Sequence, residues 1–231
     1  TMELEEALHN ADLVLLTTPV DVSLRLLPKI LDQIEHQIVA DVSSTKGKLN
    51  ERIRYHQNRE NFVSTHPMAG TEHSGPRAAF SGLFDGRATI ITDAEDSSEK
   101  ALRIVKSMYE CLNMRIIYMN AYNHDVHAAY VSHISHISSM ALALTVLEKE
   151  QNEKNILDLA SGGFDSTVRL AKSPATMWTP IFMENAGNVT AVLDTYIKHL
   201  QAFKKAMLEQ KSENITGLIN QSNKIKRVLN R

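Results

Sequence analysis

His66 occupies the position in this sequence that most directly suggests chemistry. It follows an apolar run at residues 61–65 and precedes the turn-forming sequence Pro-Met-Ala-Gly at residues 67–70. Proline and glycine hold the backbone beyond the histidine on a fixed course, and open α/β sheets bind ligands at the carboxyl ends of their strands. The pattern predicts either a histidine poised over a cleft or an ordinary turn with an incidental histidine.

Two further polar segments stand where helices are expected to begin. Residues 41–47 read Asp-Val-Ser-Ser-Thr-Lys-Gly, and their hydroxyl and N–H groups can meet a polar ligand or cap the helix. Residues 161–169 read Ser-Gly-Gly-Phe-Asp-Ser-Thr-Val-Arg, a glycine loop feeding a helix with candidate caps at residues 165–167. Arg169 near that helix start opposes the helix dipole. It therefore favours a carboxylate partner, either in a ligand or in a surface salt bridge.

Four histidines lie on one long helical segment, at His124, His127, His133 and His136. On an ideal helix, at roughly 100° per residue, His133 lies roughly 180° from His124, and His136 roughly 180° from His127. This geometry excludes a single metal ion bound by all four. We expect no metal site, with a solvated or hydrogen-bonded structural role as the default for each histidine.

The elements that must position these residues fall into two parts. Strands are expected at Leu13–Thr17, Ile38–Val42, Phe62–Thr65, Thr89–Thr92 and Arg115–Met119. Helices are expected at Val22–Ile34, Lys46–Tyr55 and Glu99–Leu112, and then at 124–150, 166–172, after Pro174, 189–211 and 213–229. The predicted fold class is α/β followed by all-α. A partial Rossmann-like parallel sheet domain occupies residues 1–119, and an α-helical domain occupies residues 120–231.

Composition narrows the class of protein. The chain has 231 residues and a formal net charge of −2, which gives no electrostatic reason to expect nucleic acid or an anionic membrane as a partner. Cys111 is the single cysteine, so there is no disulfide framework. Nothing resembles a signal peptide, and no apolar run is expected to span a bilayer. We expect a soluble, cytoplasmic protein.

Four segments together resemble the prephenate dehydrogenase family. They are Asp41-x-x-Ser44-x-Lys46-Gly47, His66-Pro-Met-Ala-Gly-Thr-Glu72, Ser132-His133-x-x-His136, and Gly162-Gly163-Phe164-x-x-x-x-Arg169 with Trp178 downstream. The resemblance extends from about Ala11 to about Leu200. It implies oxidative decarboxylation of prephenate to 4-hydroxyphenylpyruvate, or of arogenate to tyrosine, with NAD or NADP as cofactor. It also implies a dinucleotide-binding domain followed by a helical dimerisation domain, and hence a homodimer.

The resemblance assigns roles to individual residues of this chain. It implies two catalytic residues: His66 as the general base at the ring hydroxyl, and Ser44 as a support for that histidine and for the nicotinamide end of the cofactor. Its substrate-binding residues are Arg169, which binds a carboxylate, and His136, Thr71 and Glu72. Its cofactor-binding residues are Thr18, Pro19, Val20 and Ser44.

One expected feature is missing from the sequence. No Gly-x-Gly-x-x-Gly turn occurs, so either the fold needs no dinucleotide or the chain begins after the first βαβ unit. With the resemblance, we expect a truncated form of a longer dehydrogenase. Any tyrosine inhibition is expected at the active site itself. The alternatives are an arogenate dehydrogenase, a related β-hydroxyacid dehydrogenase and a non-catalytic helical dimer. The β-hydroxyacid dehydrogenase would be expected to have a lysine on the long helix, and the presence of His133 and His136 there counts against it.

Overall fold

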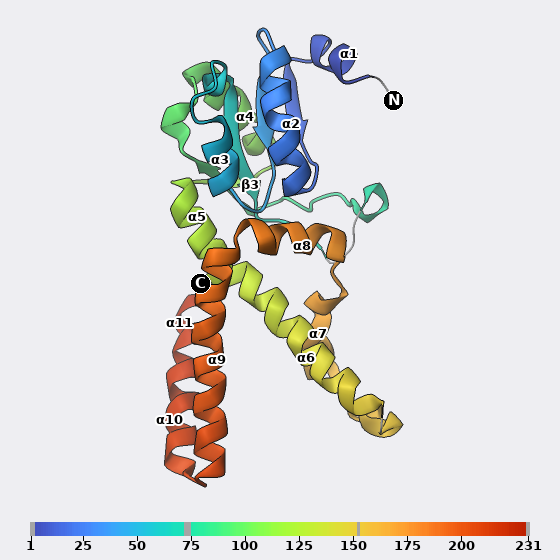
Figure 1. Ribbon diagram of the computed structural model, residues 1–231, viewed down its shortest axis with the longest axis vertical. Coiled ribbons are helices and arrows are strands. Elements are labelled where there is room, and N and C mark those ends of the chain that lie inside the picture. Colours follow the sequence, from blue (N-terminus) through green and yellow to red (C-terminus); the bar gives the residue numbers. More distant parts are fainter. Residues whose placement is uncertain (1–2, 72–74, 152, 230–231) are drawn as a thin grey trace. The chain divides into compact units, whose positions relative to one another are not determined.

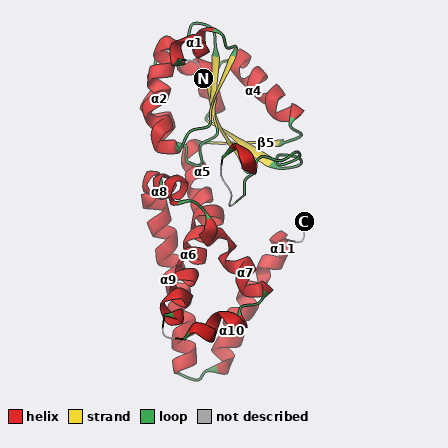
Figure 2. Ribbon diagram, turned by 90° about the vertical axis from the view of Figure 1, so that its right-hand side faces the viewer, coloured by secondary structure: helices red, strands yellow, loops and turns green. Residues whose placement is uncertain are grey.

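The computed structural model describes residues 3–71, 75–151 and 153–229. It divides into two units, Thr1–Val189 and Thr190–Arg231, and each unit is described by itself. The first unit holds the β-sheet, the helices that cover the sheet and the first helices of the C-terminal part (Figures 1 and 2).

The sheet has five strands in the order β1-β2-β3-β4-β5. Their bounds are β1 Leu13–Leu16, β2 Ile38–Asp41, β3 Phe62–Pro67, β4 Ala88–Thr92 and β5 Arg115–Met119. The strands β1, β2 and β3 are parallel, and so are β4 and β5, but β4 runs antiparallel to β3, with His66 opposite Ile90. The expected all-parallel sheet is wrong at this one pair. Parallel neighbours need a crossover, usually a helix, whereas antiparallel neighbours do not, and the sequence shows no long helical pattern between β3 and β4.

Helices cover both faces of this sheet, as Figure 2 shows for α2 and α4. The bounds are α2 Val20–Gln33, α3 Gly47–Ile53 and α4 Glu99–Cys111. Successive residues of a strand point to opposite faces. Accordingly, Val39 packs in the core under α2 and α3, whereas Ile38 and Ala40 pack in the core under α4. The fold class predicted from the sequence is confirmed in its α/β and helical parts.

The remaining helices are α1 Leu4–His9, α5 Ala121–Ala128, α6 Ile134–Glu150, α7 Gly162–Val168, α8 Ala175–Glu184, α9 Ala186–Leu208, α10 Ser212–Ser222 and α11 Lys226–Leu229. A π-helical segment at Ala129–His133 joins α5 to α6, so the two form one rod (Figure 1). This extra-wide turn interrupts the ideal helix assumed from the sequence. It contains His133 and lies directly before α6, which carries His136.

The rod Ala121–Glu150 is long and apolar enough to cross a membrane by length and composition alone, with a mean hydropathy of 1.3 over its best window and 11% of that window buried. The sequence expectation of no such run is therefore wrong. Several of its large apolar side chains are exposed, namely Tyr130, Val131, Leu142, Leu144 and Leu147. The rod also carries buried polar residues, including His124, Asp125 and His133. An apolar face on such a helix favours a contact with another protein surface.

Candidate active site

A cavity of about 570 Å³ lies beyond the carboxyl end of β3. Its walls come from the segment after β2, from β3 and the loop that follows it, and from α6, α8 and the turn after α7. Of the residues expected at the active site, it brings together Ser44, His66, Thr71, His136 and Arg169. Residues separated by more than half of the chain therefore share one cavity, as expected for a binding site.

His66 is a buried residue at the cavity wall, 9% exposed. Its Nδ1 atom lies 2.8 Å from Nε2 of His124. Burial lowers the pKa of His66 well below its usual value, and the nearby His124, Lys46 and His133 lower this pKa further. His66 is therefore neutral at physiological pH, which is the state in which an imidazole can accept a proton.

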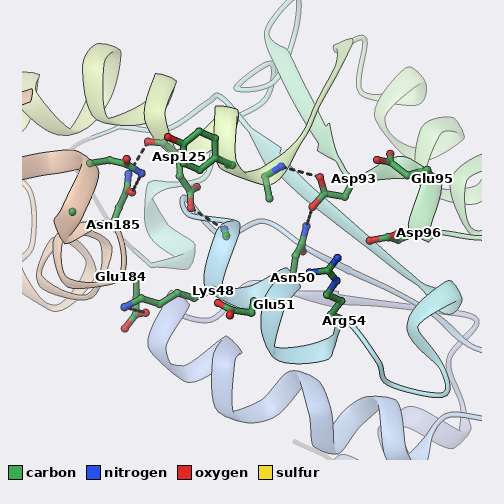
Figure 3. Close-up of a pocket in the computed structure, with 15 residues that line it drawn as sticks. Lys48, Asn50, Glu51, Arg54, Asp93, Glu95, Asp96, Asp125, Glu184 and Asn185 are labelled. Atoms are coloured by element: carbon green, nitrogen blue, oxygen red, sulfur yellow. Dashed lines mark hydrogen bonds and ion pairs between the residues drawn. The ribbon is translucent and has the colours of Figure 1, made fainter. Parts of the chain in front are cut away.

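His124 in turn contacts Asp125, with 2.8 Å between His124 Nδ1 and Asp125 Oδ1. The Asp125 carboxylate also caps α3, because Oδ1 accepts from the backbone N–H of Lys46 and Oδ2 from that of Gly47, both at 2.8 Å. Figure 3 shows Asp125 at the wall of a second cavity, with Asn185 bonded to its backbone carbonyl. Two of the N–H groups that the sequence offers to a ligand at residues 41–47, those of Lys46 and Gly47, are thus bound by a carboxylate of the chain.

Asp41 and Lys46 form a fully buried ion pair between β2 and the start of α3. Lys46 Nζ lies 2.5 Å from Asp41 Oδ2 and donates to the carbonyl of Thr65 at 2.6 Å. Burial lowers the pKa of Lys46, and Asp41 opposes that shift. The pair ties the segment that carries Ser44 to the strand that carries His66.

His136 lies on α6 and stacks on Trp178 of α8, with ring centroids 3.4 Å apart. Its Nδ1–H donates to the carbonyl of Ser132 at 3.1 Å. Burial lowers the pKa of His136, and Arg169 lowers it further. A neutral His136 then has Nε2 as its acceptor, and Trp178 fixes the plane of the ring in the cavity wall.

Arg169 lies differently from the sequence expectation. The expected helix at 166–172 begins earlier, as α7, and Arg169 follows its last residue at the start of a 3-10 turn. A cation is favourable at a helix carboxyl end, so the argument from an opposed dipole is wrong. The expected caps at residues 165–167 are wrong too: Ser161 is the N-cap position, and Ser166 and Thr167 donate back to the carbonyl of Gly163. Arg169 nevertheless lines the cavity.

The expected cofactor residues follow β1. Pro19 precedes the first turn of α2, and Thr18 Oγ1 lies 2.8 Å from Ser23 Oγ. Val20 is buried against Trp178 and Ile181, both of which line the cavity. Thr18, Pro19 and Val20 are not among the residues that line the cavity, although Val20 contacts two that are. Glu72 lies outside the described residues.

The α5–α6 rod carries four histidines, at His124, His127, His133 and His136. Within the described residues, no group of three or more potential ligands is arranged to hold a metal ion. The assumed opposition of His124 and His133 is wrong, however. The π-helical segment between them changes the winding, and both side chains are buried close enough for His124 to lower the pKa of His133.

His124 and Asp125 are the residues at this site that sequence reasoning missed. They are adjacent in the sequence, where His124 is expected to have a solvated or hydrogen-bonded structural role and Asp125 is assigned no role. Their contacts join residues 58 and 79 positions apart. The signal that could have found them was the pair of polar residues in the first turns of a helix directly after a strand.

Family descriptions match almost the whole chain. Residues 2–118 match "Prephenate dehydrogenase, nucleotide-binding domain", and residues 120–221 match "Prephenate dehydrogenase, dimerization domain". The cyclohexadienyl dehydrogenase of Zymomonas mobilis is 29% identical over 99% of this chain and 79% of its own length. The prephenate dehydrogenase of Lactococcus lactis is 27% identical over 99% of this chain, which spans 64% of that relative.

A solved structure agrees with these matches. The prephenate dehydrogenase of Aquifex aeolicus in complex with hydroxyphenyl propionate and NAD⁺ has a TM-score of 0.84 and 29% identity, covering 100% of this chain and 81% of that chain. The two family matches extend over both parts of the fold. The chain therefore belongs to the prephenate dehydrogenase family of NAD-dependent oxidoreductases.

Proposed function

We propose that this protein catalyses the NAD-dependent oxidative decarboxylation of prephenate to 4-hydroxyphenylpyruvate, a step of tyrosine biosynthesis in the cytoplasm. The observation that carries the proposal is the single cavity that gathers His66, His136 and Arg169. This set offers a neutral base, a second neutral imidazole and a guanidinium. A cyclic dianion whose hydroxyl must be oxidised requires groups of these kinds.

The residues at the carboxyl ends of β1, β2 and β3 fit a bound dinucleotide, with Thr18, Pro19 and Val20 on its adenosine side and Ser44 at its nicotinamide end. Because these strands are parallel, the segments that carry Thr18, Ser44 and Pro67 follow the same edge of the sheet, where α/β folds bind dinucleotides. When bound, the nicotinamide supplies the hydride acceptor. The NAD⁺ in the related solved structure supports NAD over NADP as the first choice.

His66 acts as the general base in this proposal. Its Nε2 accepts the proton of the ring hydroxyl while hydride leaves the carbon that bears this hydroxyl. Loss of the ring carboxylate as carbon dioxide returns its bonding electrons to the ring and makes the ring aromatic. The phenol product keeps a hydrogen on the same oxygen, so His66 returns its proton and finishes neutral. Ser44, on the same cavity wall, orients the histidine and the hydride acceptor.

Arg169 binds a substrate carboxylate, because its planar fork matches that group. His136, held flat by Trp178, contacts the pyruvyl side chain, which is the feature that distinguishes prephenate from arogenate. Thr71, which lines the cavity, contributes a polar contact to the substrate. Arogenate remains the second candidate substrate, because the Zymomonas relative is named for the cyclohexadienyl ring that both compounds share.

The protein is proposed to act as a homodimer. The match to a dimerization domain covers the α5–α6 rod, and exposed apolar side chains on α6, such as Leu144 and Leu147, need a covering surface. Sedimentation equilibrium should give a dimer, and a monomer at all concentrations would refute this part. Tyrosine, which shares the 4-hydroxyphenyl group of the product, is proposed to inhibit by competing with prephenate.

The test of the proposed function is a steady-state assay of NADH formation by absorbance, with prephenate or arogenate and with NAD or NADP. Prephenate with NAD should give the highest kcat/KM. The His66→Asn variant should lose about 100-fold or more in kcat, as expected when a general base is removed, with little change in KM. Unchanged turnover in this variant would overturn the role of His66. His56→Asn, at a pair with Asp32 away from the residues that line the cavity, is the matched control.

A further inference from the structure

His124 and Asp125 are buried beside His66 but have no part in the reaction as proposed above. Asp125 Oδ1 lies 2.8 Å from His124 Nδ1, and His124 Nε2 lies 2.8 Å from His66 Nδ1. The two histidine rings meet edge to face, with centroids 5.1 Å apart. These three side chains therefore form one continuous hydrogen-bonded row that ends at the cavity.

The direction of each hydrogen bond in this row follows from Asp125. Both of its carboxylate oxygens accept backbone N–H groups of α3, from Lys46 and Gly47. An ionised carboxylate has only acceptors, so Nδ1 of His124 must be the donor. A neutral His124 then has Nε2 as its acceptor, and the partner of that atom, Nδ1 of His66, must carry a proton.

We propose that Asp125 and His124 are positioning residues that hold His66 as the Nδ1–H tautomer, with the lone pair of Nε2 available to the substrate hydroxyl. This inference rests on the proposed function of His66 as the base. The other tautomer would carry its proton on Nε2 and could not accept one there. Tautomer choice, rather than proximity alone, then decides whether His66 can react.

The same row also stabilises His66 after it has taken the proton. Protonated His66 keeps donating from Nδ1 to His124, and Asp125 holds a negative charge at the far end of the row. No proton needs to pass to Asp125 in this step. Burial and the nearby His124, Lys46 and His133 all lower the pKa of His66, and the negative charge of Asp125 at the far end of the row opposes their effect.

The row is tested first without any turnover. Nitrogen NMR of ¹⁵N-histidine-labelled protein distinguishes the two neutral tautomers of an imidazole by the shifts of its ring nitrogens. We expect His66 as the Nδ1–H form in the unliganded protein and as a mixture in His124→Phe, whose ring cannot accept a hydrogen bond. An Nε2–H form of His66 in the unaltered protein would overturn the proposal. This readout does not depend on which substrate the enzyme uses.

Kinetics then separate positioning from packing. The amide oxygen of His124→Gln can still accept from His66 Nδ1–H, whereas His124→Phe better preserves ring shape. A positioning role predicts that His124→Phe loses roughly 100-fold in kcat at nearly constant KM, in the manner of other histidine-orienting groups, and that His124→Gln recovers part of the loss. If His124→Phe is the more active of the two, packing is the role and the proposal fails. His127→Gln, at an exposed position of α5, should retain full activity.

If His66→Asn has normal turnover, the base assignment fails whatever the NMR shows. If His66→Asn is inactive and His66 is the Nε2–H tautomer, the dehydrogenase function and the need for His66 stand, whereas the positioning proposal fails together with the choice of Nε2 as the accepting atom. The two results therefore separate the failure of this inference from the failure of the proposed function.

Discussion

Replacing Lys46 with methionine should destabilise the protein far more than the removal of a surface lysine. Lys46 has no exposed side-chain area, and neither does its partner Asp41. Its ammonium donates to Asp41 Oδ2 at 2.5 Å and to the Thr65 carbonyl at 2.6 Å. Methionine has similar length and no charge, so it leaves the Asp41 carboxylate buried without its cation.

The expected magnitude follows from the groups left behind. Removing one partner of a buried ion pair costs about 3–5 kcal/mol. Asp41 would keep two backbone donors, Ser43 N at 2.9 Å and Thr65 N at 3.1 Å, which places the loss near the lower end of that range. The Thr65 carbonyl would also lose a donor. The total free energy of unfolding of a typical domain is about 5–15 kcal/mol. Only a protein in the upper part of that range would keep most of its stability in the variant.

Urea unfolding followed by circular dichroism measures this loss. The matched control is Lys48→Met two residues further on, whose ammonium pairs with Glu184 at 3.1 Å and whose side chain is 56% exposed. Exposed pairs contribute about 0–1 kcal/mol. Equal losses in Lys46→Met and Lys48→Met would refute the reasoning. In the double variant with Asp41→Asn, no buried charge is left unpaired, so its loss should be smaller than the sum of the single losses.

Lys46→Met should also change the pKa of His66. The positive charge of Lys46 is one of the causes that lower the pKa of His66, although burial is the larger one. The pKa of His66 should therefore rise in the variant and still remain below its usual value. An NMR titration of the His66 ring measures this shift, and a further fall in the pKa would contradict the electrostatic argument.

Four other predictions concern single residues. Arg169→Ala should raise the KM for prephenate by about 10- to 100-fold with a smaller effect on kcat, since about 1.5–3 kcal/mol is lost with a charged hydrogen bond. Burial lowers the pKa of His133 to about 4, so this residue is neutral in the folded protein near neutral pH. The unfolded chain binds the proton of His133 first as the pH falls, so the free energy of unfolding should decrease between pH 6.5 and pH 4, by up to about 1.4 kcal/mol per pH unit. The decrease should be smaller in His133→Leu. Gly47→Ala would place a Cβ 3.0 Å from Asp125 Oδ2 and should lower kcat, which steady-state kinetics measures. Gly217→Ala, with open space around it, should stabilise α10 by about 0.5–1 kcal/mol, which chemical denaturation measures.

The strands and sheet-covering helices were predictable because their signals are local. The expected strand at Ile38–Val42 and the observed β2 at Ile38–Asp41 differ by one residue, since a buried apolar run bounded by polar residues marks its own ends. The direction of β4 was predicted wrongly, because β4 runs antiparallel to β3. It depends on how the chain between Pro67 and Ala88 returns to the sheet, and an alternating pattern assigns every strand the same direction by default.

Only those residues of the candidate site that belong to a recognisable sequence motif were predictable. His66, His136 and Arg169 were identified by their sequence segments, and the fold places all three at one cavity. The reason given for Arg169 was nevertheless wrong, because the helix boundary lay elsewhere. Helix boundaries are the least reliable part of a sequence-based prediction, and arguments from a helix dipole depend entirely on them.

The contact between Asp125 and α3 shows why the remaining part of the site could not be inferred from the sequence. Residues 41–47 contain serine and threonine that could cap α3 locally, but the cap comes from a carboxylate 78 residues later in the chain. A remote carboxylate joins two elements that a local hydroxyl would leave independent. Because α3 fixes Asp125, Asp125 fixes His124, and His124 contacts His66, the start of one helix determines the orientation of the proposed base. A substitution that shifts this helix start should therefore change kcat without any contact with the substrate.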